Sequence, residues 1–215
     1  MPDRDQVEQL TSCDGPAFRE LYEIYAGSIA AREQKPEAWI CAMIRAPEYR
    51  FCVLQRDGHV TAFSILFLPQ TEPFALLEYM AVAPRHRNHG LGSKVFKQSV
   101  KQAVRPDGRR LPVLLEVDSD REASSDQHIR TRRQQFYRRL GCLRVSGLHY
   151  ILPLAGEGDP PMMDLMVYAP AQQPLAKAHL ERWLRTIYRD VYHSSPDDPR
   201  IARMLDGVPD PVRLE

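Results

Sequence analysis

A short loop between two apolar segments carries the residue types that bind anions. It reads Arg87-Asn88-His89-Gly90-Leu91-Gly92, with Arg85 two residues before it. Glycine lets the backbone turn so that several N–H groups face one side, and the first four N–H groups of a helix have no partner inside that helix. If a helix follows the loop, its dipole and the arginines favour negative charge here, and a pyrophosphate is the natural ligand.

The flanking residues predict the elements that would hold this loop. Leu76 to Val82 is an apolar run that ends before Pro84, which is typical of a buried strand. After the loop, apolar residues recur at helical spacing with lysines between them, which predicts an amphipathic helix. Its apolar face comprises Phe96, Val100, Ala103 and Val104.

Two better-known phosphate-binding loops do not fit this stretch. A P-loop requires G-x-x-x-x-G-K-[ST], whereas Gly92 is followed by Ser93 and Lys94, and no glycine stands at the required earlier position. The dinucleotide-binding fingerprint requires a third small residue at the position where this chain has Val95. The loop therefore belongs to neither class.

The loop and its flanks resemble the central motif of the GNAT superfamily of acyl-CoA N-acyltransferases, V-x-P-x-x-[RQ]-x-x-G-x-[GA] between a strand and a helix. This chain supplies Val82, Pro84, Arg87, Gly90 and Gly92 without a gap. The resemblance implies an α/β fold of the GNAT type, with a central mixed, mostly antiparallel, twisted sheet whose central parallel strands splay apart between flanking helices. The alternative is an ordinary glycine turn that caps a helix.

A second motif of the superfamily, F-Y-x-x-x-G-F, resembles the segment from Phe136 to Cys142, in which Cys142 replaces the usual aromatic residue. The resemblance makes Tyr137 the proton donor to the departing coenzyme A sulfur; the alternative is a tyrosine that only packs its ring on the sheet. It also implies acetyl-CoA as co-substrate. The residues expected to contact acetyl-CoA are Met80, Ala81, Val82, Arg87, Asn88, His89, Gly90, Leu91, Gly92 and Ser93.

Two acids are candidates for the base that such a reaction needs. An alkyl amine has a pKa of about 10, so a base must take its proton at neutral pH. Glu78 and Glu116 both lie inside apolar runs, where an acid is unfavourable unless it is paired or faces a cleft. We expect Glu78 to share a strand face with Met80 and Val82 and rank it first, with Glu116 second. For each, a structural hydrogen-bonded role is the alternative.

Composition sets the class of protein. The chain has 215 residues, of which 43% are hydrophobic and 27% charged, as in soluble globular proteins. Lys and Arg total 29 against 28 Asp and Glu, so no net field favours nucleic acid or an anionic membrane. No apolar run approaches transmembrane length, and the N-terminus lacks an apolar signal region. We therefore expect neither a nucleic acid nor a membrane as partner.

The cysteines predict no metal site. Cys13, Cys41, Cys52 and Cys142 lack C-x-x-C spacing and a matching histidine pattern. We expect buried free thiols rather than a zinc site or a disulfide framework, which fits a reducing cytoplasm.

The remaining patterns predict one domain with a C-terminal extension. Residues 1–170 would form the acyltransferase domain, and residues 171–215 a helix and tail packed on it, with a homodimer contact as another role for the extension. An Asp-Gly pair at 57–58 predicts a hairpin, and Asp14 is expected to cap the first helix. Strands are expected at 7–11, 50–55, 59–68, 76–82, 111–117, 143–152 and 162–168, and helices at 16–31, 37–45, 132–140 and 175–191.

The sequence thus predicts an N-acetyltransferase that moves an acetyl group from acetyl-CoA to an amine of a small molecule, protein or peptide in a ternary complex. One alternative is a donor with a longer acyl chain. Another is a non-catalytic module that binds or senses acyl-CoA. A cluster of arginines between residues 130 and 139 leaves nucleic-acid binding as a third, less favoured alternative.

Overall fold

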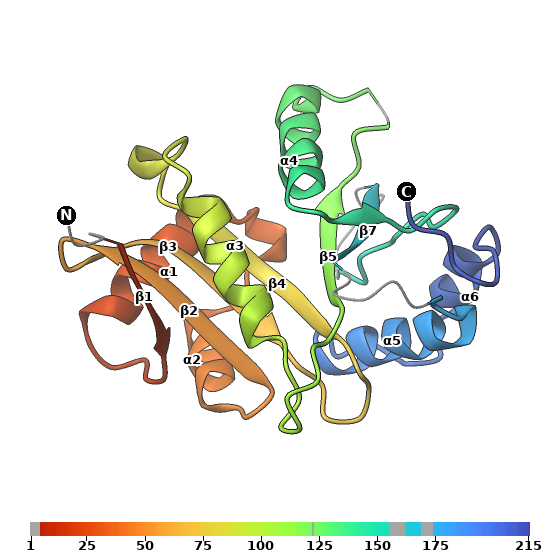
Figure 1. Ribbon diagram of the computed structural model, residues 1–215, viewed down its shortest axis with the longest axis horizontal. Coiled ribbons are helices and arrows are strands. Elements are labelled where there is room, and N and C mark those ends of the chain that lie inside the picture. The colour runs from red at the N-terminus through yellow and green to blue at the C-terminus, as the bar shows by residue number, and fades with distance from the viewer. Residues whose placement is uncertain (1–4, 122, 155–161, 169–173) are drawn as a thin grey trace. The chain divides into compact units, whose positions relative to one another are not determined.

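The structure is a computed structural model that describes residues 5–121, 123–154, 162–168 and 174–215 (Figure 1). Its residues fall into two compact units. The first contains residues up to 70 together with 75–110, and the second contains residues 71–74 together with 111–215. We describe each unit by itself.

Four antiparallel strands form the sheet of the first unit. They are β1 (Asp5–Leu10), β2 (Tyr49–Arg56), β3 (His59–Phe67) and β4 (Ala75–Val82), in that spatial order. The β2–β3 hairpin turns at Asp57 and Gly58, whose φ angles are 53° and 81°. Positive φ at both positions is the conformation that an Asp-Gly hairpin turn requires, and the predicted hairpin is confirmed.

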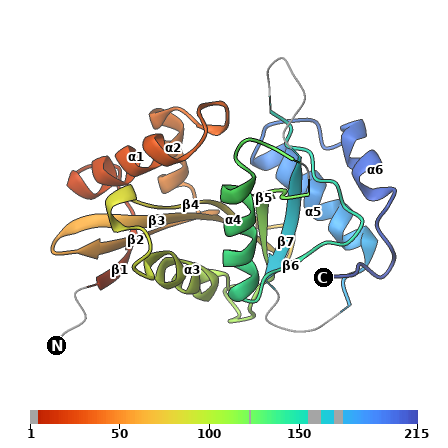
Figure 2. The same ribbon diagram turned by 90° about the horizontal axis from the view of Figure 1, so that it is seen from above.

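Helices cover both faces of this sheet (Figure 2). Helices α1 (Pro16–Ser28) and α2 (Glu37–Arg45) lie on one face, and α3 (Leu91–Gln102) on the other. Alternation along the strands explains this arrangement, since Phe51 and Val53 of β2 pack with α1 and α2, whereas Cys52 and Leu54 pack with α3. Two short 3-10 helices, η1 (Ala31–Glu33) and η2 (Pro84–His86), complete the unit.

Two local predictions for the first unit were wrong. Helix α1 is capped by Gly15 without a side-chain hydrogen bond, and Asp14 bonds instead to the hydroxyl of Ser12. Cys13 and Cys41 form a disulfide with a Cα–Cα distance of 5.5 Å, which lies within the usual range. Spacing could not indicate this pair because 28 residues separate the two cysteines, and only the fold brings α2 beside the start of α1. Cys52 and Cys142 are free and buried, as expected.

The second unit is built on three antiparallel strands in the order β5-β7-β6. These are β5 (Val113–Asp118), β7 (Met163–Tyr168) and β6 (Leu143–Arg144). Its helices are α4 (Gln127–Arg139), α5 (Lys177–Asp190) and α6 (Pro199–Leu205). Among the described residues, no helix is long and apolar enough to span a membrane.

Two elements of this unit differ from the prediction. Helix α4 begins at Gln127 rather than Arg132. Arg130 forms an ion pair with Asp126, four residues earlier, and this pair stabilises a first turn that the polar sequence alone does not predict. The predicted strand over 143–152 is a two-residue strand followed by single bridges at Val145 and Tyr150. Gly147, with φ of +76°, turns the chain between them. The turn predicted between 155 and 161 lies outside the described residues.

The C-terminal segment is an integral part of the second unit. Helix α5 buries the apolar face that its sequence predicts, including Leu180, Leu184 and Ile187, each fully buried. The end of the chain then pairs with β6: the N–H of Arg144 donates to the carbonyl oxygen of Glu215 at 2.7 Å, and the reverse bond measures 2.9 Å. The tail therefore covers the free edge of β6, which would otherwise present unpaired backbone groups.

Candidate active site

The glycine loop of the first unit has the backbone expected of an anion site. Gly90 is the N-cap of α3 and has a left-handed conformation with φ of 78°, and Asn88 has φ of 66°. Leu91 anchors the helix start in the core beside Val95. The first turn of α3 contains no acidic residue, so the positive end of its dipole is not neutralised by its own side chains.

Basic side chains surround this loop. Arg85, Arg87 and His89 are exposed, and the Arg87 guanidinium donates through Nε to the carbonyl oxygen of Val82 at 3.2 Å. That bond ties the loop back to the end of β4. Partial burial and the charge of Arg85 lower the pKa of His86, so at neutral pH this imidazole offers hydrogen bonds rather than a charge.

A β-bulge in β4 sets the direction of Glu78. Tyr79 lies opposite Ile65 and Leu77 lies opposite Leu66, so Glu78 is the extra residue on its strand. Tyr79 packs on the face of the sheet covered by α1 and α2, and the Glu78 carboxylate also reaches a partner from that side, Lys35. Met80 and Val82 face α3 instead. The prediction that Glu78 shares a face with them was wrong, because period-two alternation fails at a bulge.

Glu78 is a buried acid with a lysine partner. Its Oε1 accepts a hydrogen bond from Nζ of Lys35, and the two side chains are 2% and 12% exposed, respectively. Its Oε2 is buried and accepts no hydrogen bond within the described part of the chain. Burial raises the pKa of Glu78 above its usual range, although the charge of Lys35 and its hydrogen bond lower it. A carboxyl group with a raised pKa is suited to proton transfer near neutral pH.

Tyrosines fix the segment that carries Lys35. The hydroxyl oxygen of Tyr25 accepts a hydrogen bond from the Lys35 backbone N–H at 2.6 Å. The Tyr79 hydroxyl donates to the carbonyl oxygen of Glu33 at 2.9 Å, and Nζ of Lys35 lies 5.6 Å from the centre of the Tyr79 ring. Sequence reasoning missed Lys35, since a single lysine before a proline carries no signal of a buried ion pair.

Tyr137 lies in the last turn of α4, in the second unit. It is 9% exposed, and burial raises its pKa to about 12 against the opposing charge of Arg133. Its carbonyl oxygen accepts a hydrogen bond from the Cys142 N–H at 3.0 Å, after Gly141, with φ of 94°, has turned the chain away from the end of α4. The hydroxyl is therefore protonated at neutral pH, as a proton donor must be.

Glu116, in β5, has both carboxylate oxygens engaged. Oε1 accepts a hydrogen bond from the Tyr150 hydroxyl, and Oε2 accepts one from the Tyr192 hydroxyl at 2.5 Å. The charge of Glu116 adds to burial in raising the pKa of Tyr150 far above its usual value. This geometry matches the hydrogen-bonded role that the sequence left open for Glu116.

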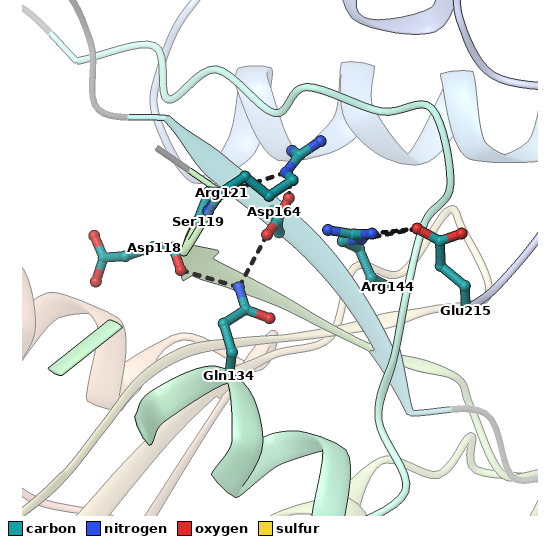
Figure 3. A network of polar contacts seen from close by, with 7 residues as sticks. All are labelled: Asp118, Ser119, Arg121, Gln134, Arg144, Asp164 and Glu215. Carbon is teal, nitrogen blue, oxygen red and sulfur yellow. Dashed lines mark hydrogen bonds and ion pairs between the residues drawn. The ribbon is translucent and has the colours of Figure 1, made fainter. Parts of the chain in front are cut away.

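A polar network joins α4 to the two strands beside it (Figure 3). Asp164 of β7 is fully buried; its Oδ1 accepts a bond from Nη2 of Arg121 at 2.5 Å, and its Oδ2 accepts one from Nε2 of Gln134 at 3.0 Å. The same amide nitrogen of Gln134 donates to the carbonyl oxygen of Asp118 at 2.9 Å. Gln134 lies one helical turn before Tyr137, so this network fixes the part of α4 that carries the tyrosine.

The predicted site residues thus divide between the two units. The glycine loop, the end of β4 and Glu78 belong to the first, whereas Tyr137 and Glu116 belong to the second. No cluster of three metal-ligating side chains occurs among the residues that the structure describes.

The sequence model of the GNAT family of acetyltransferases matches residues 16–142, more than half of the chain and a range that includes both predicted motifs. The chain therefore belongs to the GNAT acetyltransferase family, which confirms the predicted resemblance and its α/β fold class. No curated protein matches the sequence.

Solved structures show the same fold. A GNAT-family protein from Bacteroides thetaiotaomicron shares 22% identity, with a TM-score of 0.69 over 87% of this chain and 98% of the other. The ribosomal-protein-S18-alanine N-acetyltransferase from Escherichia coli shares 19% identity, with a TM-score of 0.53 over 79% and 98%. A GNAT family acetyltransferase from Elizabethkingia anophelis, solved with acetyl-CoA bound, shares 13% identity, with a TM-score of 0.51 over 77% and 97%.

Proposed function

We propose that this protein transfers an acetyl group from acetyl-CoA directly to a primary amine, with Glu78 as the base and Tyr137 as the acid. The observation that carries the proposal is the placement of a buried carboxyl group, whose pKa is raised by burial, on a bulge of β4, the strand that leads into the basic glycine loop. Bulges occur often beside active sites because they redirect a side chain.

The loop and strand supply the donor site in this proposal. N–H groups from Asn88 to Ser93 and the Arg87 side chain hold the pyrophosphate, in keeping with the left-handed turn at Gly90 and with a first turn of α3 that contains no acidic residue. The backbone from Met80 to Val82 holds the pantetheine amides. The charge and shape of the loop suit a pyrophosphate whatever acyl group the thioester carries.

The chemistry then needs proton transfers at the nitrogen and at the sulfur. The acceptor ammonium passes one proton to Glu78, directly or through water, and the neutral nitrogen attacks the thioester carbonyl carbon. The carbon–sulfur bond breaks as the amide forms, and Tyr137 gives a proton to the leaving thiolate. The nitrogen then loses its second proton, which restores the Tyr137 hydroxyl directly or through water. Because Lys35 occupies Oε1 of Glu78, Oε2 is the oxygen that accepts the proton.

Glu116 is the second candidate base, and replacing each acid in turn distinguishes it from Glu78. Glu78→Gln should abolish transfer while acetyl-CoA still binds. Glu116→Gln should lower stability, because its oxygens serve Tyr150 and Tyr192, with little effect on turnover. Loss of turnover in Glu116→Gln but not in Glu78→Gln would assign the role of base to Glu116.

The acceptor is an amine of a small molecule, protein or peptide. One relative of the same fold acts on the alanine of a ribosomal protein, which makes peptide amino termini a reasonable first set to test. A cytoplasmic location stays a prediction, although its argument from four free thiols fails with the disulfide between Cys13 and Cys41. A homodimer contact of the C-terminal segment also stays a prediction.

Calorimetric titration with acetyl-CoA tests the donor. Gly90→Asp should abolish binding by placing a carboxylate in the phosphate loop. Gly108→Asp is the matched control, because its φ of +81° resembles that of Gly90 and neither position has an atom within 4 Å of an added Cβ. Gly108 lies beyond the other end of α3, so its variant should bind normally.

Each outcome of the titration has a consequence. Loss of binding in Gly90→Asp alone would support the donor site and justify a screen of amines read by thiol release. Binding of longer acyl-CoAs in preference to acetyl-CoA would mean that the protein transfers a longer acyl group. Binding without transfer to any amine would favour a sensing module, and a folded protein that binds no acyl-CoA would refute the proposal.

A further inference from the structure

The proposed base already holds an amine of the protein itself. Nζ of Lys35 donates a hydrogen bond to Oε1 of Glu78. A substrate amine must also lie close to this carboxylate, since a base has to lie within hydrogen-bond reach of the proton that it removes, directly or through one water. Lys35 is therefore a primary amine that already lies within reach of the proposed base, at Oε1, whereas a substrate amine would use Oε2.

The residues around Lys35 restrict the position of its amine and its exposure to solvent. The Tyr25 hydroxyl fixes its backbone N–H at 2.6 Å, and the Tyr79 ring faces Nζ at 5.6 Å from the ring centre. A carboxylate and an aromatic face together are the usual recognition elements for an ammonium group. With 12% of its side chain exposed, Lys35 differs from ordinary surface lysines.

We propose that Lys35 is a site of self-acetylation, with acetyl-CoA as the donor and Nζ of Lys35 as the acceptor. The proposal rests on the proposed function and adds an acceptor that belongs to the chain. It follows from the contact between Lys35 and Glu78 and from the position of Glu78 on the bulge of β4, the strand assigned to the pantetheine arm.

The reaction balances without a further reactant. The Lys35 ammonium gives one proton to Glu78, its nitrogen forms an amide bond with the acetyl carbonyl carbon, and the carbon–sulfur bond of the thioester breaks. The nitrogen loses its second proton as the amide forms, and coenzyme A leaves as the free thiol. The modified Lys35 has no positive charge, so Glu78 loses its cationic partner.

Peptide mass spectrometry after incubation with acetyl-CoA tests this directly. After reduction of the Cys13–Cys41 disulfide, trypsin releases the peptide Glu33 to Arg45, which contains Lys35 as its single lysine. Lys97 and Lys101 are exposed on α3 and serve as internal controls. Spontaneous acetylation by a thioester would modify these exposed amines first, whereas acetylation assisted by Glu78 should favour Lys35 by about tenfold or more.

Two variants complete the design. Glu78→Gln should remove the preference for Lys35 while acetylation of Lys97 and Lys101 continues unchanged. Lys35→Arg should retain a cation beside Glu78 and show no acetylation in this peptide. Protein unfolded in denaturant should show no preference among its lysines.

The outcomes separate this proposal from the proposed function. Preferential acetylation of Lys35 that depends on Glu78 supports it. If the protein binds acetyl-CoA and acetylates an added amine while Lys35 stays unmodified, self-acetylation is refuted and the proposed function stands. Modification of Lys35 at the rate of the exposed lysines, or equally in Glu78→Gln, also refutes it. Failure to bind acetyl-CoA refutes both.

Discussion

The side-chain amide of Gln134 in α4 donates to the buried carboxylate of Asp164 in β7 at 3.0 Å. This bond connects a helix to the middle strand of the sheet in the second unit, and Arg121 takes the other oxygen of the same carboxylate. Tyr137 follows Gln134 by one helical turn. The position of the predicted proton donor therefore depends on a hydrogen bond made one turn earlier in α4.

Replacement of Asp164 tests that dependence. Asp164→Ala removes the buried carboxylate that accepts hydrogen bonds from both the Gln134 amide and Arg121, so the free energy of unfolding should fall by about 2–3 kcal/mol. Asp164→Asn keeps an oxygen acceptor of the same size and should lose less. Denaturant unfolding measures both variants, and equal stability of Asp164→Ala and the parent protein would show that the network does not hold the unit together.

A second close contact in this unit involves two glycines. A Cβ atom on Gly147 would lie 2.1 Å from the carbonyl oxygen of Gly207, and Gly147 has φ of +76°. Gly147→Ala should therefore destabilise the protein by about 3 kcal/mol, through overpacking added to backbone strain. Gly108→Ala has nearly the same φ and open space around its Cβ, so it should lose only about 1 kcal/mol. Similar melting temperatures for the two variants would contradict the close approach of residues 147 and 207.

The sequence predicted several elements that a local pattern decides. The Asp57-Gly58 turn, the start of α3 at the glycine loop and the apolar face of α5 all follow from residue spacing. Contacts between distant segments were not predicted. The disulfide of Cys13 with Cys41 and the pairing of the last residues with β6 both join segments that are distant in the sequence.

The candidate site shows the same limit. Motif spacing gave the loop residues and Tyr137 as candidates because a motif is a local pattern, and Glu78 became a candidate as an acid inside an apolar run. The face of Glu78 was mispredicted, since a bulge inserts one residue and no residue in Ala75–Val82 marks it. Lys35 was missed because its role depends on a contact 43 residues away in the sequence.

Tyr137→Phe should separate catalysis from binding. Removal of the hydroxyl should lower kcat by about a hundredfold if Tyr137 protonates the leaving thiolate, while the Kd for acetyl-CoA stays the same. Tyr188→Phe is the control: its hydroxyl donates to the carbonyl oxygen of Ile151 at 2.5 Å, so its loss should affect stability rather than turnover. Unchanged kcat in Tyr137→Phe would leave the tyrosine with a packing role only.

The pH dependence of kcat/KM reports on Glu78. Transfer requires the deprotonated carboxylate, so activity should fall as the pH drops through the pKa of Glu78. Burial raises that pKa, which places the acidic limb above the pH of about 4.3 expected for an ordinary glutamate. The charge of Lys35 lowers the pKa. In Lys35→Gln, Glu78 therefore holds its proton more tightly, and the limb should move to higher pH. Lys97→Gln, on the exposed surface of α3, should leave it in place. If the acidic limb stays at the same pH in Lys35→Gln, a group other than Glu78 accepts the proton.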